Sequence, residues 1–146
     1  MAEDDDDALR LESDHEASGR TAIVSDEGDS VWLYLTAPDG AELSRDCWLF
    51  NKPSAPAEPK VDQYGEQSLP PPAPASLIRP EGVGACPPEE AFDIVWSADG
   101  ESVLVRLRGA ALGMICAGYE RGFSCHLQAE CGWGQPFDDE LMQRTF

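Results

Sequence analysis

The chain has 146 residues, the usual length of a single domain, and 42% of them are hydrophobic, which suffices for a core. Its 28 acidic and 10 basic side chains give a formal net charge of −18, which argues against direct binding to nucleic acids and anionic membranes, since both require clusters of Lys and Arg. No apolar run is long enough to span a membrane, and the N-terminus lacks the basic and then apolar pattern of a secretory signal, so we expect a cytoplasmic protein that attracts basic partners.

The first part of the chain is the most acidic. Residues 1–30 hold 11 acidic and two basic side chains, which is half of the net charge. The acidic run at residues 3–7 and the polar residues after it offer almost nothing to bury. We therefore expect residues 1–19 to form a disordered acidic tail and residues 20–146 to form a single globular domain.

A first hairpin is predicted directly after this tail. Residues 30–36 are rich in β-branched and aromatic side chains, residues 38–40 have turn chemistry, and residues 43–50 form the returning strand. A three-residue turn with glycine in the left-handed region pairs Leu35 with Leu43, and it pairs Val31 with Cys47.

Three aromatic side chains share one face of this predicted hairpin. Trp32, Tyr34 and Trp48 lie there because successive side chains of a strand point to opposite faces. The face is either covered by another part of the chain or presented to a partner, and aromatic residues supply much of the binding energy of protein interfaces. Together with the acidic residues beside them, the candidate partner-binding residues are Trp32, Tyr34, Trp48, Asp39, Glu42 and Asp46.

Proline dominates the middle of the chain. Ten of the twelve prolines lie between residues 53 and 88, where they prevent an ordinary helix or sheet. We expect a long loop at 53–88 that interrupts the globular domain.

The second predicted hairpin has the clearest pattern. Residues 92–97 and 102–108 alternate between apolar and polar side chains, and Asp99-Gly100 between them is a preferred hairpin turn. Counting outward from this turn pairs Trp96 with Val103, Ile94 with Val105 and Phe92 with Leu107, all on one face. The same register sets Asp93 opposite Arg106 on the other face, where opposite charges favour this alignment.

The last third of the chain is less regular. Residues 110–118 are small and apolar, which fits a buried strand or a short helix, and a turn at 119–123 would make residues 123–128 a returning strand. A short helix is expected from Pro136, with Phe137 and Leu141 on the face that docks to the sheet. The predicted fold class is mainly β (α+β): an antiparallel sheet built from hairpins, or a small sandwich, with a short C-terminal helix.

The cysteines do not predict a disulfide framework. Their number is odd and none form a Cys-x-x-Cys pair, so reduced thiols are expected. Four possible zinc ligands, Cys116, Cys125, His126 and Cys131, lie within sixteen residues. A three-residue turn at 120–122 would set Cys116 opposite His126 but turn Cys125 to the other face, so we predict neither a metal nor a cofactor.

Catalytic signatures are weak as well. Since His15 lies in the predicted tail, His126 is the one candidate general base, and no nucleophile or nucleotide-binding motif accompanies it. We expect a protein that is not an enzyme. The alternative, a thiol- or metal-dependent enzyme centred on His126 and the C-terminal cysteines, stays open.

In size, acidity and lack of catalytic motifs, the chain resembles the bacterial inhibitor and immunity proteins, which neutralise a basic partner such as a toxin. This resemblance implies that acidic residues speed the encounter while the aromatic residues named above provide the binding energy. A third alternative is a structural protein whose charge only keeps it in solution.

Overall fold

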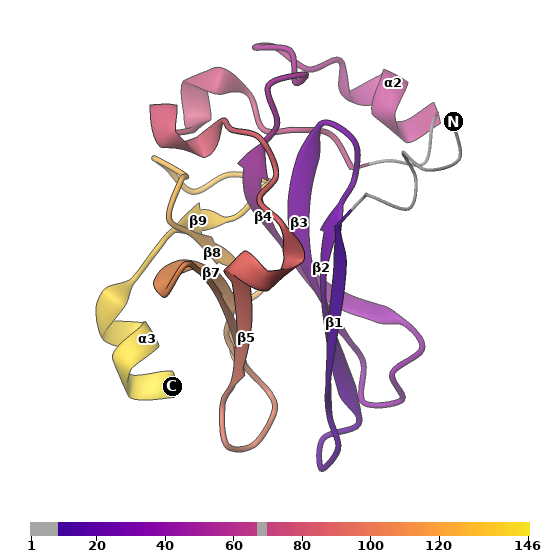
Figure 1. The fold of residues 1–146 in the computed structure, drawn as a ribbon, viewed down its shortest axis with the longest axis vertical. Helices are drawn as coiled ribbons and strands as arrows, with labels where there is room; N and C mark the ends of the chain where they lie inside the picture. Colours follow the sequence, from indigo (N-terminus) through magenta and orange to yellow (C-terminus); the bar gives the residue numbers. More distant parts are fainter. Residues whose placement is uncertain (1–8, 67–69) are drawn as a thin grey trace.

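The computed structural model describes residues 9–66 and 70–146, and within them the chain folds into two β-sheets with a short helix near the C-terminal end (Figure 1). The predicted fold class is therefore confirmed. The first sheet has the order β1-β2-β3-β4 and contains β1 (Arg10–His15), β2 (Arg20–Asp26), β3 (Ser30–Thr36) and β4 (Leu43–Asn51). The second has the order β5-β6-β7-β8-β9 and contains β5 (Phe92–Trp96), β6 (Val103–Leu107), β7 (Ala110–Ile115), β8 (Phe123–Ser124) and β9 (Gln135–Pro136).

The helices are all short. They are α2 (Val61–Glu66), α3 (Asp139–Thr145) and the 3₁₀ turns η1 (Ala75–Leu77), η2 (Pro80–Gly82) and η3 (Glu89–Ala91). In the described part of the chain, none of them has the length and apolar character needed to cross a membrane.

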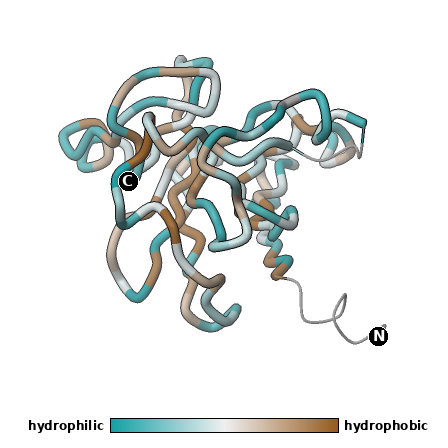
Figure 2. The backbone as a smooth tube through the Cα atoms, turned by 90° about the horizontal axis from the view of Figure 1, so that it is seen from above, coloured by the Kyte–Doolittle hydropathy of each residue, from teal (hydrophilic) through white to brown (hydrophobic). Residues whose placement is uncertain are grey.

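The two sheets share one core. Strand β4 packs against β7 and β8, and hydrophobic residues gather in the centre of the molecule (Figure 2). The largest fully buried side chains of this core come from both sheets: Val24, Val31, Leu33, Leu35, Leu49, Val103, Val105 and Ile115. The second sheet also buries a smaller cluster on its opposite face, beneath α3.

Strand β1 corrects the expected tail. Residues 10–15 pair with β2, so the prediction of disorder was wrong for residues 9–19, while residues 1–8 lie outside the described part of the chain. Leu11 packs against the core, and Ser13 Oγ accepts a hydrogen bond of 2.9 Å from the indole nitrogen of Trp96 in the other sheet. Every second residue of the acidic stretch thus faces inward, an alternation that its high charge conceals.

The first hairpin forms with a different register from the one expected. Leu33 pairs with Cys47 and Thr36 with Leu43, because irregularities after Val31 and after Leu35 shift the alignment. The predicted pairs of Leu35 with Leu43 and of Val31 with Cys47 were therefore wrong. The shared face was correct, since Trp32 and Trp48 are direct cross-strand partners.

The second hairpin matches its prediction at every pair. Trp96, Ile94 and Phe92 oppose Val103, Val105 and Leu107. Asp93 opposes Arg106, and their charged groups lie 3.6 Å apart. The Asp99-Gly100 turn fixes this register because Gly100 adopts a positive φ of 72°.

The C-terminal part departs from its prediction in two places. Residues 110–115 form a strand, but the returning strand β8 has two residues and pairs Met114 with Phe123, so Cys116 is not opposite His126. Helix α3 begins at Asp139 rather than Pro136, because Asp138 caps it by accepting a 3.0 Å hydrogen bond from the Leu141 amide. The predicted docking of Leu141, with Phe137 beside it, is confirmed.

Candidate functional site

A pocket of about 500 Å³ lies on the face of the first sheet that points away from the core. Tyr34 is part of its lining, and the strand register places Ile23 beside Tyr34 and Glu12 beside Ile23. Glu27, Leu43 and Pro70 also line this pocket. The pocket thus combines residues from all four strands of the first sheet with one residue of the proline-rich segment.

Carboxylates dominate the surroundings of Tyr34. Burial, followed by the nearby charges of Glu27 and Asp46, raises the pKa of the Tyr34 hydroxyl far above its ordinary value. The hydroxyl therefore stays protonated and remains a hydrogen-bond donor. Arg10, the one base among the described residues of the lining, donates a 2.9 Å hydrogen bond to Glu12, so Glu27 has no basic partner in this lining.

The β3–β4 loop extends this surface. Asp39 and Glu42 are exposed there, and so is Leu43 at the start of β4, with 58% of its surface accessible. The loop is fixed on the β1–β2 turn because Gly19, at a φ of +74°, lets the carbonyl of Pro38 approach so closely that a Cβ would collide with it. We call the surface formed by Glu12, Glu27, Tyr34, Leu43 and Asp46, with Asp39 and Glu42 at its rim, the acidic face.

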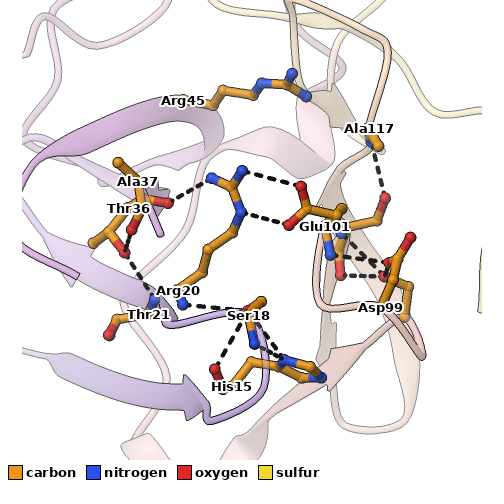
Figure 3. A network of polar contacts seen from close by, with 12 residues as sticks. His15, Ser18, Arg20, Thr21, Thr36, Ala37, Arg45, Asp99, Glu101 and Ala117 are labelled. Atoms are coloured by element: carbon orange, nitrogen blue, oxygen red, sulfur yellow. Dashed lines mark hydrogen bonds and ion pairs between the residues drawn. The ribbon is translucent and has the colours of Figure 1, made fainter. Parts of the chain in front are cut away.

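A polar network also holds the edge of the acidic face against the second sheet (Figure 3). Arg20 donates to both carboxylate oxygens of Glu101, at 2.8 and 3.1 Å, and to the carbonyl of Thr36 at 2.9 Å. Thr36 immediately precedes the β3–β4 loop. Arg20 therefore joins the start of this loop to the β5–β6 turn, so the acidic rim is held by a fixed support.

Two of the predicted binding residues are buried. Trp48 is fully buried and Trp32 retains 5% of its accessible surface, because Ala73, Ile78 and Leu127 cover them. Their assignment as partner-contact residues was therefore wrong. The sequence left open whether this face is buried or exposed. The proline-rich segment covers the part of the face that carries Trp32 and Trp48, so that part is buried.

The other four predicted residues, Tyr34, Asp39, Glu42 and Asp46, lie together on the acidic face. Tyr34 is half-buried and the three acids are exposed. Sequence reasoning missed Glu12 and Glu27. The alternation that places Leu11 inward and Glu12 outward was the available signal, and assigning residues 1–19 to a tail concealed it.

The cysteine and histidine group does not converge. Burial raises the pKa of the Cys116 and Cys125 thiols to about 11, so both remain protonated near neutrality. Burial also lowers the pKa of His126, whose backbone carbonyl accepts a 2.8 Å hydrogen bond from the Arg79 amide. Residues 9–66 and 70–146 contain no group of three or more His, Cys, Asp or Glu side chains placed to hold a metal ion.

Comparison with known proteins returned no match among family models, curated sequences or solved structures. What this chain does must therefore be inferred from its own residues.

Proposed function

We propose that the protein is a non-catalytic binding module, of the inhibitor type, that uses the acidic face to hold a basic protein. The observation that carries this proposal is the pocket around Tyr34: a half-buried aromatic ring in a hollow rimmed by carboxylates with a single base. The free state of all five cysteines supports a reducing compartment, and we place this binding in the cytoplasm.

The geometry suits the side chain of an arginine or a lysine. The ring of Tyr34 is stacked on that of Trp32, with centroids 6.3 Å apart and planes 9° from parallel, so it is held in place before binding. A cation over such a ring gains about 0.5–2 kcal/mol, depending on desolvation. Glu12 and Glu27 stand beside the ring as acceptors for the charged group, and Leu43 offers an exposed apolar contact.

The charge of the whole chain acts at longer range. A net charge of −18 draws basic proteins toward the molecule and accelerates their encounter, an effect that salt weakens. Total charge alone would favour no particular face. A test must therefore hold the net charge constant and change only its position.

The test compares two variants of equal net charge. One carries Glu27→Gln and Asp46→Asn on the acidic face, and the other carries Glu89→Gln and Glu90→Gln at η3, where both side chains are exposed and outside the pocket. Affinity for an arginine-rich peptide is measured by calorimetry for both and for the unchanged protein. We expect the acidic-face variant to lose about tenfold or more in affinity, since loss of a charged hydrogen bond typically costs about 1.5–3 kcal/mol, and the η3 variant to lose little. Equal losses would mean that only total charge matters and would reject the proposal.

A further inference from the structure

A second hollow, unrelated to the acidic face, lies between α3 and the second sheet. It has a volume of about 360 Å³. Val95, Leu104 and Ala111 of the sheet line one side, and Met142 and Phe146 at the C-terminal end line the other. We call this hollow the α3 groove. Its volume falls within the range of small-molecule sites, about 300–1,000 Å³.

Among residues 9–66 and 70–146, Arg106 is the only ionisable side chain in the lining of the α3 groove. This composition differs from that of the pocket around Tyr34, where Glu12 and Glu27 outnumber the single base. In a chain with a net charge of −18, a hollow that presents a cation and apolar walls without a carboxylate side chain is a local exception. Such a lining complements a ligand that is apolar along its length and anionic at one end.

The bonding capacity of Arg106 is only partly used. Its contact with Asp93 is long, at 3.6 Å, and both side chains are partly solvent-exposed, with accessible fractions of 43% for Arg106 and 59% for Asp93. Its Nε is buried and finds no hydrogen-bond partner among the described residues. By contrast, all three guanidinium nitrogens of Arg20 donate hydrogen bonds. The weak pair with Asp93 leaves the Arg106 guanidinium free to turn toward a better acceptor.

We propose that the α3 groove binds a small apolar carboxylate. Its carboxylate would lie on the Arg106 guanidinium, whose planar fork matches two carboxylate oxygens, and its hydrocarbon part would pack on Val95, Leu104 and Phe146. Met142 in the wall is an unbranched side chain that adapts to apolar ligands of varied shape. The acidic face plays no part in this binding.

Titration of the ¹⁵N-labelled protein with octanoate, followed by NMR at physiological ionic strength, tests the proposal. We expect saturable shifts of the Val95, Leu104 and Met142 amides. Octanol, which has the same chain without the charge, is expected to bind about tenfold more weakly, in line with the loss of a charged hydrogen bond. Absence of saturable shifts, or equal binding of octanol, would reject a carboxylate site.

Variants separate the charge from the fold. Arg106→Gln is expected to weaken octanoate binding about tenfold, while Arg108→Gln, an exposed arginine outside the lining, leaves it unchanged. Asp93→Asn removes the competing carboxylate and is expected to strengthen binding, so it still tests the proposal if Arg106→Gln fails to fold. Unchanged affinity in Asp93→Asn together with equal losses in both arginine variants would overturn the assignment.

Discussion

Replacement of Asn51 by alanine is the sharpest test of how the proline-rich segment is held. Asn51 is buried, and its carboxamide joins β4 to residue 73. Its Oδ1 accepts hydrogen bonds from Trp48 Nε1 at 2.8 Å and from the Ala73 amide at 3.0 Å, and its Nδ2 donates to the Ala73 carbonyl at 2.7 Å. The Asn51 side chain therefore satisfies three buried polar groups, which are the indole nitrogen of Trp48 and the amide and carbonyl of Ala73.

The expected cost follows from these three groups. Leaving a buried donor or acceptor without its partner costs about 1–3 kcal/mol, so the loss of all three partners in Asn51→Ala is expected to lower the free energy of unfolding by about 3–9 kcal/mol. This is a large part of the roughly 5–15 kcal/mol that stabilises a typical domain. For a chain of this length, it corresponds to a fall in melting temperature of roughly 10–30 °C.

Urea unfolding, followed by tryptophan fluorescence, measures this cost. Gln63→Ala provides the control, because it removes a carboxamide from an exposed position on α2 and is expected to change stability by less than about 0.5 kcal/mol. Hydrogen exchange should also show faster opening at residues 70–78 in Asn51→Ala. A loss of less than about 1 kcal/mol would show that this network does not hold the segment, and the burial of Trp32 and Trp48 would need another cause.

The remaining predictions concern the support of the acidic face and the thiols. Arg20 holds the pKa of Glu101 below its usual 4.5, so the folded state binds fewer protons than the unfolded state and stability falls as the pH drops below about 4.5. Glu101→Gln should flatten this dependence in urea titrations between about pH 3 and pH 6, and an unaltered slope would contradict the ion pair. Gly19→Ala should destabilise the fold more than Gly109→Ala. Both glycines have a positive φ, which costs about 1–2 kcal/mol for alanine, but only the new Cβ at position 19 would collide with a neighbour, the carbonyl of Pro38. Equal losses of stability in thermal unfolding would contradict the close approach of Pro38 to Gly19. Cys116 and Cys125, with thiol pKa values of about 11, should react slowly with iodoacetamide near pH 8 until the protein is unfolded. Rapid labelling, detected by mass spectrometry, would contradict the burial of Cys116 and the partial burial of Cys125.

The second hairpin shows what the sequence alone can determine. The Asp99-Gly100 turn fixes the count, the alternation of apolar residues selects the face, and Asp93 opposite Arg106 disfavours a slip by one residue. In the first hairpin the same reasoning identified the shared face of Trp32 and Trp48. It missed the register because irregularities within the strand pair have no clear signal in the side-chain pattern.

The candidate site was harder to predict than the strands. Burial of Trp48 depends on Ala73 and Ile78, which lie more than twenty residues further along an irregular segment, and a hairpin pattern contains no information about such a covering. The pocket around Tyr34 joins β3 to Glu12 of an edge strand whose charges resemble those of a disordered tail. Local patterns therefore located Tyr34 and its neighbouring acids, whereas contacts between distant segments determined which of the aromatic residues are accessible.

Mapping the contact surface of a basic ligand on the unchanged protein tests the acidic face most directly. The ¹⁵N-labelled protein is titrated with an arginine-rich peptide at low and at high salt, and the amide shifts are followed by NMR. We expect saturable shifts that are centred on Glu12, Tyr34 and Leu43 and that become weaker at high salt. Shifts of equal size at Glu89 and Glu130, which lie outside the pocket, would contradict it, because they would show attraction to charge without a site.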